Sequence, residues 1–240
     1  MRAILFDCDG TIADTLGLIC EAMRRVFVAH ALPAPGDAAT RAIVGLSLET
    51  AIARLHPDGE TALHGAMAET YRSTFRSTRD DAQFRETLFD GVRDMLDALR
   101  SREEVLLGLV TGKSRRGVTA ICTAHGLTDH FQVVRTADDC PSKPHPAMVL
   151  ECCDTLGIRP RDALVIGDAV YDIEMAKAAG SDAIGVAWGA GKAETLLAAG
   201  ALSVASNVAA LALAIDAWLD AGSAVAAPDG AATTLAGRAF

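Results

Sequence analysis

The sequence predicts an α/β fold in which a parallel β-sheet carries helices on both faces and an all-helical segment follows the first strand. Three observations predict it. Four short apolar runs have the composition of buried strands, and helical patterns separate them. Three of these runs end in a cluster of polar residues. Residues 16 to about 84 show helical periodicity and no strand-like run, which indicates a separate helical unit.

The elements follow in order along the chain. The predicted strands are Arg2–Phe6, Val105–Val110, Ala163–Ile166 and Ala183–Ala187. The predicted helices between the later strands are Val92–Leu99, Gly117–His125, Pro146–Leu156 and Asp172–Ala179. A helical bundle would not explain why polar clusters follow the apolar runs, so the α/β interpretation is preferred.

The segment after the first strand has apolar residues at helical spacing, beginning at Leu16, Ile19 and Met23, and Pro and Gly interrupt it near 32–36 and 56–59. We expect four or five helices there. Residues 221–240 are rich in small residues and lack a periodic apolar face, which predicts a loosely ordered tail. The expected domains are therefore a sheet domain and a helical insert, formed by 1–15 with 85–220 and by 16–84.

Composition limits the function classes. The chain has 240 residues, with 22 Lys and Arg against 31 Asp and Glu, and a net charge of −9. Nucleic-acid binding is disfavoured because it needs concentrated positive charge, whereas a small anionic substrate remains compatible. No apolar run reaches the ~18–20 residues of a membrane span. Six cysteines occur without a C-x-x-C pair, so we expect reduced thiols in a cytoplasmic protein. The sequence carries no indication of oligomeric state.

Four polar clusters are the candidate functional residues, at positions 7–11, 111–113, 142–146 and 167–168. Three directly follow predicted strands, and ligands of open parallel sheets bind at the carboxyl ends of strands. Clustered carboxylates repel one another unless a cation neutralises them, and oxygen ligands suit Mg²⁺. A carboxylate such as Asp7 is a competent nucleophile toward phosphorus. Asp9 could then exchange protons, and Lys143 with Thr111 could hold the phosphoryl oxygens.

These clusters resemble the signatures of the haloacid dehalogenase-like (HAD) superfamily, specifically its phosphatases with a helical cap after the first strand. The four motifs appear in order as DCDGT at 7–11, VTGK at 110–113, SKPHP at 142–146 and GDAVYD at 167–172. The resemblance covers about residues 1–220. It implies a Rossmann-like three-layer core and a helical cap at 16–84, with hinges near 14–15 and 86–90.

The resemblance also implies residue roles. Asp7 would be the nucleophile that forms an aspartyl-phosphate, and Asp9 the general acid and base. Mg²⁺ would bind Asp7, the backbone carbonyl of Asp9, and Asp168. Asp172 would act in the second shell, orienting Lys143 or a metal-bound water.

The phosphate ligands implied by the resemblance are Thr111, Gly112 and Lys143, with Gly112 contributing only its backbone N–H. Two positions depart from the family pattern: Ala169 is often Ser or Thr, and Gly112 is often Asn. For Lys113 two interpretations are open, a neighbour of the phosphate or a solvated charge. Arg72, Arg76 and Arg79 share a helix face, which indicates either a solvated surface or a contact with a substrate carboxylate or second phosphate.

Other activities of the superfamily fit less well. Dehalogenases lack the second aspartate, here Asp9, and phosphonate hydrolases need a cap lysine, whereas residues 16–84 contain none. Hexose-phosphate mutases carry a histidine a few residues past Asp14, and this chain has none there. The runs at 43–48 and 185–189, together with KPHP, look most like phosphoglycolate phosphatases. Pyrophosphate, a sugar phosphate or a nucleotide monophosphate stay open as substrates, and so does a catalytically silent binding protein.

Overall fold

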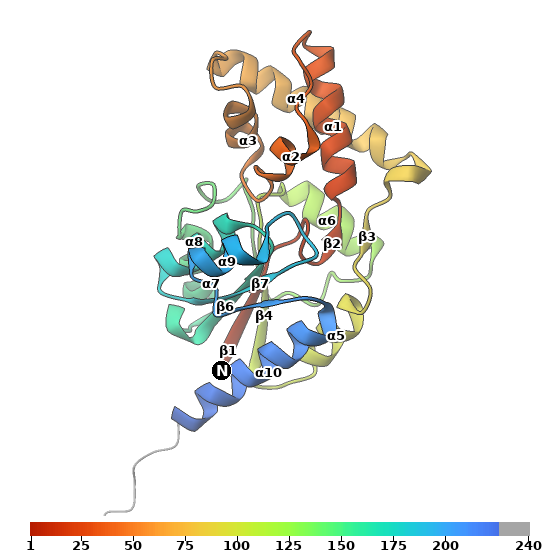
Figure 1. Ribbon diagram of the computed structural model, residues 1–240. Helices are drawn as coiled ribbons and strands as arrows, with labels where there is room; N and C mark the ends of the chain where they lie inside the picture. Colours follow the sequence, from red (N-terminus) through yellow and green to blue (C-terminus); the bar gives the residue numbers. More distant parts are fainter. Residues whose placement is uncertain (226–240) are drawn as a thin grey trace, which may run out of the picture.

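One parallel sheet organises the computed structural model, which describes residues 1–225. Its strand order is β5-β4-β1-β6-β7-β8, and each neighbouring pair is parallel (Figure 1). The strands are β1 Arg2–Phe6, β4 Val105–Val110, β5 Val133–Arg135, β6 Ala163–Gly167, β7 Asp182–Val186 and β8 Ser203–Ala205. The four predicted strands are all present, with ends that differ by no more than one residue. The chain thus has a Rossmann-like α/β fold.

The sequence missed the two edge strands, β5 and β8. Each has three residues, and each pairs on one side only, β5 with β4 and β8 with β7. Runs this short show neither an alternating pattern nor a continuous apolar stretch, so periodicity cannot identify them.

Side chains of the sheet alternate between two hydrophobic layers. In β1, Ile4 and Phe6 pack into one layer, while Ala3 and Leu5 pack into the other. The first layer is covered by α5 (Val92–Arg100), α6 (Arg115–Ala124) and α10 (Val208–Val225), and the second by α7 (Ala147–Leu156), α8 (Val170–Ala179) and α9 (Ala193–Ala199). This burial on both faces explains why β1 reads as a continuous apolar run.

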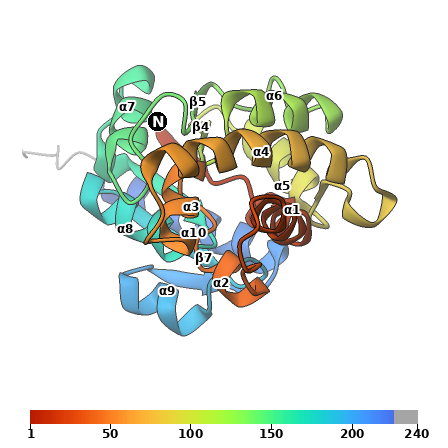
Figure 2. The same cartoon turned by 90° about the horizontal axis from the view of Figure 1, so that it is seen from above.

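The segment after β1 is helical and lies over the carboxyl ends of the strands (Figures 1 and 2). It contains α1 Leu16–Ala29, α2 Asp37–Arg41, α3 Leu48–Leu55 and α4 Thr61–Arg79, followed by the 3₁₀ helix η1 Ala82–Phe84. These helices pack around their own buried residues, among them Met23, Ile52 and Met67. The four α-helices agree with the expected number.

Two short strands connect this helical segment to the sheet. The chain leaves through β2 (Ala13–Asp14) and returns through β3 (Thr87–Leu88). They pair antiparallel, with Ala13 opposite Leu88 and Asp14 opposite Thr87. Both connections therefore run side by side, at the places where the sequence predicts hinges.

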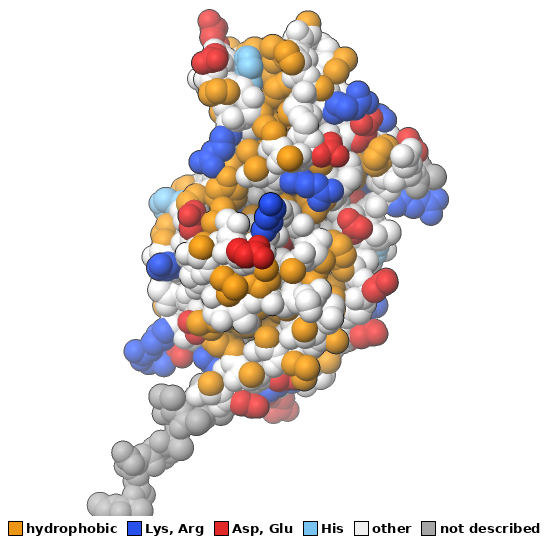
Figure 3. Space-filling view, viewed as in Figure 1, with side chains coloured by type: hydrophobic (Ala, Val, Ile, Leu, Met, Phe, Trp, Pro, Cys, Tyr) orange, Lys and Arg blue, Asp and Glu red, His pale blue; other side chains and the backbone are white. Residues whose placement is uncertain are grey.

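The C-terminal part differs from the prediction in one respect. Helix α10 continues to Val225, past residue 221 where the sequence predicts a loose tail. The rest of that predicted tail, 226–240, lies outside the described residues. Within the described part of the chain, no helix is long and apolar enough to cross a membrane. On the face in Figure 3, Lys and Arg side chains are interspersed with Asp and Glu and do not form one basic patch.

Candidate active site

The three central strands bring the predicted site residues to one edge. Asp7 directly follows β1, Thr111 follows β4, and Asp168 follows Gly167 at the end of β6. Because β1 lies between β4 and β6 in parallel register, their carboxyl ends are adjacent. All three side chains are buried.

Lys143 joins two of the carboxylates. Its Nζ lies 2.7 Å from Asp7 Oδ1 and 2.5 Å from Asp172 Oδ1, and its side chain is fully buried. Burial by itself lowers the pKa of Lys143, but the carboxylates of Asp172 and Asp7 outweigh burial and raise the pKa above its ordinary value. Lys143 is therefore a fixed cation. The predicted contact between Asp172 and Lys143 is present, and the second oxygen of Asp172 accepts a hydrogen bond from the Ala169 backbone N–H at 3.0 Å.

Asp168 is fixed by groups from two other loops. Its Oδ1 accepts a hydrogen bond from the Thr11 hydroxyl at 3.1 Å, and its Oδ2 accepts one from the backbone N–H of Ala190 at 2.7 Å. Gly10 lies against this carboxylate with φ +83°, where a Cβ atom would overlap Asp168. The loop after β1 thus needs glycine both for its left-handed backbone and for the close approach.

The cluster carries more negative charge than its surroundings compensate. Carboxylate oxygens of Asp7, Asp168 and Asp172 lie within 4.8 Å of one another, and Oδ2 of Asp7 is buried without a hydrogen-bond partner. Burial raises the pKa of Asp7 to about 7, although Lys143 partly opposes the shift. Burial and the carboxylates of Asp7 and Asp172 likewise raise the pKa of Asp168. A hard cation with oxygen ligands fits this arrangement.

This excess charge predicts a pH-dependent stability difference in metal-free protein. The Asp7 carboxyl loses its proton near pH 4 when unfolded and near pH 7 when folded, so its contribution to the free energy of unfolding falls as pH rises through that window. Asp7→Asn removes this effect. Relative to wild type, the Asn variant should therefore gain about 2.5 kcal/mol between pH 5 and pH 8, or roughly 5–10 °C in Tm, because about two of the three pH units of the shift lie in this window.

Thermal melts in a chelator at both pH values measure this gain, with Asp154→Asn, at an exposed aspartate, as the matched control. Adding Mg²⁺ at pH 8 should raise the Tm of wild type. At a free Mg²⁺ concentration of 100 times Kd, the free energy of unfolding should increase by about 2.7 kcal/mol. The Tm of Asp168→Asn should not rise. A Tm difference between wild type and Asp7→Asn that stays constant from pH 5 to pH 8 would contradict the expected burial of charge.

Asp9 contacts a different set of residues. Its Oδ1 lies 2.9 Å from the Thr15 hydroxyl and 2.9 Å from Nζ of Lys113. Lys113 Nζ also lies 2.9 Å from Oε1 of Glu86, just before β3, and 4.9 Å from the centroid of the Phe75 ring. The Lys113 side chain is only 8% exposed. Lys113 therefore joins the loop that carries Asp9 to the second connecting strand, and the interpretation as a solvated charge is wrong.

Replacing Lys113 with Met should lower kcat by about 10- to 100-fold, because it leaves Asp9 and Glu86 without their shared cation. Burial by itself lowers the pKa of Lys113, but Asp9 and Glu86 outweigh burial and raise it, so the wild-type residue is charged at neutral pH. Kinetics of a phosphate ester, corrected for the folded fraction, measure the effect, with exposed Lys192→Met as control. A kcat within twofold of wild type would show that Asp9 does not need this ion pair.

The helical segment docks onto the sheet domain around Gly112. A Cβ atom at this position would lie 2.6 Å from the carbonyl oxygen of Gly45 and 2.5 Å from that of Leu46. Close by, the backbone N–H of Ser47 donates to the hydroxyl of Ser142 at 2.8 Å. The loop after α2 can approach this closely only because position 112 has no side chain. This is a physical reason for Gly112 where the family often has Asn.

Ala169 and Tyr171 extend the same contact. Both belong to the hydrophobic cluster of the helical segment, and the Tyr171 hydroxyl donates to the carbonyl of Ala42 at 3.0 Å. Arg54 donates to that hydroxyl at 2.7 Å. A hydroxyl at position 169 would replace part of an apolar contact, so the alanine fits its surroundings.

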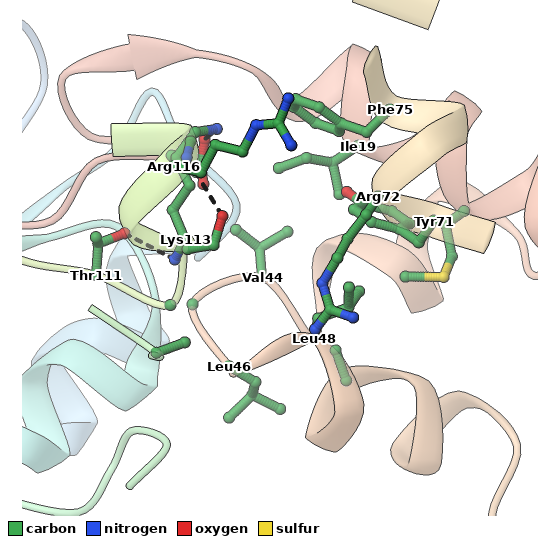
Figure 4. Close-up of a pocket in the computed structure, with 18 of the residues that line it drawn as sticks. Ile19, Val44, Leu46, Leu48, Tyr71, Arg72, Phe75, Thr111, Lys113 and Arg116 are labelled. Carbon is green, nitrogen blue, oxygen red and sulfur yellow. Dashed lines mark hydrogen bonds and ion pairs between the residues drawn. The ribbon is translucent and has the colours of Figure 1, made fainter. Parts of the chain in front are cut away.

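A cavity of about 770 Å³ opens between the two parts of the protein (Figure 4). On the sheet side it is lined by Asp7, Asp9, Thr111, Gly112 and Lys113. The Thr111 hydroxyl accepts a hydrogen bond from the Lys113 backbone N–H at 3.2 Å, which leaves its own hydrogen available to a ligand. On the helical side, the cavity is lined by all three arginines that share a face of α4, Arg72, Arg76 and Arg79.

Several contributors were not singled out from the sequence. Thr11 belongs to the DCDGT motif, but the motif alone does not indicate a role for it. Its contact with Asp168 depends on the turn at Gly10. Ala190 contributes only a backbone N–H, for which a sequence carries no signal. Glu86 lay in the predicted hinge, yet nothing in a single sequence pairs it with Lys113.

Comparisons with known proteins agree with this geometry. The family described as haloacid dehalogenase-like hydrolase matches residues 4–186. The chain is 32% identical over 199 residues to a phosphoglycolate phosphatase of Chromobacterium violaceum, covering 82% of this chain and 89% of that one. It is 29% identical over 198 residues to a phosphoglycolate phosphatase of Photorhabdus laumondii, covering 82% and 84%. The crystal structure of a hydrolase from Pseudomonas syringae superposes with a TM-score of 0.81 at 21% identity, covering 90% and 99%.

Proposed function

Because the chain belongs to the haloacid dehalogenase-like hydrolase family, we propose that it is a phosphatase that hydrolyses small phosphate monoesters, with the Asp7 carboxylate as nucleophile. One observation carries this proposal. Oδ1 of Asp7 is fixed by Lys143, while Oδ2 is buried and has no hydrogen-bond partner, in a residue that lines the cavity. A buried carboxylate oxygen left free in this way is available to attack phosphorus.

The reaction would proceed in two displacements. Oδ2 of Asp7 forms a bond to phosphorus as the ester oxygen leaves, and Asp9 gives the leaving alcohol its proton. A water molecule then attacks phosphorus, Asp9 accepts its proton, and the Asp7 carboxylate is released with inorganic phosphate. Lys143 and the Thr111 hydroxyl stabilise negative charge on the phosphoryl oxygens.

Asp9 must reach the leaving group for this role. Its contacts are with Thr15 and Lys113, and no hydrogen bond among residues 1–225 joins it to Asp7. Thr15 and Glu86 both adjoin the strands that connect the helical segment to the sheet, so a movement of that segment would change the surroundings of Asp9. We propose that 16–84 acts as a cap over a core formed by 1–15 and 85–220.

The donor set fits Mg²⁺. Carboxylate oxygens of Asp7 and Asp168 would hold the ion together with the backbone carbonyl of Asp9, and Asp172 would orient Lys143. When bound, Mg²⁺ would neutralise the carboxylates and the charge on the phosphoryl group. The proximity of the three carboxylates, within 4.8 Å of one another, and the raised pKa of Asp168 both support a cation in this cluster.

The names of the relatives support a substrate class. Two of them are phosphoglycolate phosphatases, which favours a small phosphorylated metabolite of that kind. Pyrophosphate, sugar phosphates and nucleotide monophosphates are the alternatives. A catalytically silent binding protein is disfavoured because Asp7, Asp9, Lys143 and Asp168 are all retained. A cytoplasmic location is proposed because all six cysteines are free and buried.

The direct test is phosphate release from 2-phosphoglycolate, para-nitrophenyl phosphate and a panel of phosphorylated metabolites, with Mg²⁺ and with chelator. We expect Mg²⁺-dependent turnover of monoesters that is lost in Asp7→Asn. Pure, folded protein that releases no phosphate from any compound of the panel would favour the silent binding protein. Turnover of pyrophosphate ahead of every monoester would select that alternative.

A further inference from the structure

The cavity offers more than a phosphoryl group and a short leaving group require. Its volume of about 770 Å³ lies in the upper part of the range of small-molecule pockets, ~300–1,000 Å³. One wall is apolar, formed by Ile43, Val44 and Leu46 of the docked loop and by the rings of Tyr71 and Phe75 on α4. Space and apolar surface are thus available beside the catalytic carboxylates.

Most cations of the cavity are already neutralised. Lys113 forms ion pairs with both Asp9 and Glu86. A guanidinium nitrogen of Arg79 lies 3.3 Å from Oε2 of Glu86. Arg72 is paired with Glu69 and with Glu49, the latter at 2.5 Å. These three side chains therefore have little charge left for a ligand.

Arg76 and Arg116 are different. The side chain of neither residue has a hydrogen bond or ion pair with any other part of the described chain; both residues are exposed, and both line the cavity. Arg76 lies on the same face of α4 as Phe75 and Arg72, and Arg116 lies in the first turn of α6, on the sheet side. In Figure 4 the Arg116 side chain extends toward α4, where Phe75 lies. Lys113, just before α6, contacts the same Phe75 ring, so these two helices approach each other here.

We infer that Arg76 and Arg116 form a subsite for a second anionic group of the substrate, a carboxylate or a second phosphate, within the cavity that holds Asp7. This inference rests on the proposed phosphatase function and adds the chemistry of the leaving group. Two guanidinium groups from opposite sides of one cavity suit a planar or tetrahedral anion, because each can donate two parallel hydrogen bonds. The apolar wall contacts the carbon skeleton between the two anionic ends.

The subsite predicts a preference among substrates of similar size. Phosphate esters with a second anion should have a higher kcat/KM than neutral ones, for example 3-phosphoglycerate compared with glycerol 3-phosphate. If the subsite binds a carboxylate, kcat/KM should be higher for 3-phosphoglycerate than for fructose 1,6-bisphosphate. If it binds a second phosphate, the order should be reversed. Both comparisons use the same protein preparation; the first pair differs only in the carboxylate, and the second pair also differs in its carbon skeleton.

The test measures kcat/KM of Arg76→Met and Arg116→Met for the preferred substrate and for para-nitrophenyl phosphate, which has no second anion. We expect kcat/KM for the preferred substrate, divided by kcat/KM for para-nitrophenyl phosphate, to fall by about 10- to 100-fold in each variant. The fall should come from a higher KM for the preferred substrate, because a charge-assisted hydrogen bond is lost. Met retains the length and apolar character of the arginine stem. Arg100→Met, at an exposed arginine of α5 outside the cavity, should leave the ratio unchanged.

The outcomes separate this inference from the proposed function. A ratio unchanged in both arginine variants, or an equal loss on both substrates, overturns the subsite while phosphatase activity stands. Failure of wild type to hydrolyse any ester overturns the phosphatase proposal. In that case calorimetric titration with 3-phosphoglycerate still tests the subsite. An equal Kd for wild type and Arg76→Met would contradict it.

Discussion

Replacing Asp7 with Asn should reduce kcat by about 10⁴-fold or more, because the amide cannot form the bond to phosphorus that starts the reaction. The substitution is nearly isosteric. Its carbonyl oxygen can still accept the hydrogen bond that Lys143 donates to Oδ1 in the wild type. The loss should therefore appear in kcat while the protein remains folded and able to bind phosphate esters.

Steady-state kinetics with 2-phosphoglycolate or another hydrolysed ester measure this effect, and a thermal melt verifies the fold. Asp154→Asn changes an exposed aspartate in the same way and should keep wild-type activity. Residual activity above about 1% of wild type in Asp7→Asn, after exclusion of deamidation by mass spectrometry, would show that another group attacks phosphorus.

Lys143→Met is expected to affect both activity and stability. The substitution leaves the buried carboxylates of Asp7 and Asp172 without their cation, and breaking such a buried pair costs about 3–5 kcal/mol. For a chain of this size, the Tm should fall by roughly 10 °C. Turnover should fall by about 10³-fold or more, since the cation that orients Asp7 and stabilises the phosphoryl oxygens is lost.

Raising the pH should increase the instability of Lys143→Met, because Asp7, whose pKa is raised by burial, then ionises without its cation. Lys192→Met is the matched control at an exposed lysine. Melts at pH 5 and pH 8 in chelator, together with kcat at a temperature where both proteins are folded, separate the two effects. A folded Lys143→Met variant with a wild-type kcat would exclude Lys143 from catalysis.

The sequence was informative where side-chain chemistry and strand order coincide. β1 and β4 were predicted with their observed ends, and the polar residues after them were expected to meet because carboxyl ends of parallel strands share an edge. Of the two partners that the resemblance implies for Asp172, Lys143 or a metal-bound water, the structure shows Lys143. These features depend on residue type and on a connectivity that local patterns indicate.

Features that depend on tertiary packing were less accessible. The role of Lys113 was open because a single lysine has no local signal for burial, and its partners lie 104 residues away at Asp9 and at Glu86 in another segment. From the sequence, Gly112 is only a position that departs from the family pattern. The structure shows the reason, because the Gly45 backbone packs against it. Edge strands β5 and β8 were too short for their pattern to appear.

The central claim is that a phosphoryl group becomes bonded to Asp7 during turnover. Rapid quenching of wild-type protein with substrate, reduction with borohydride and peptide mass spectrometry test it most directly, because reduction converts an aspartyl-phosphate into homoserine. We expect homoserine at position 7 in reactions that contain substrate, and none in its absence. Steady turnover with unmodified Asp7, or with homoserine at a different aspartate such as Asp168, would contradict it.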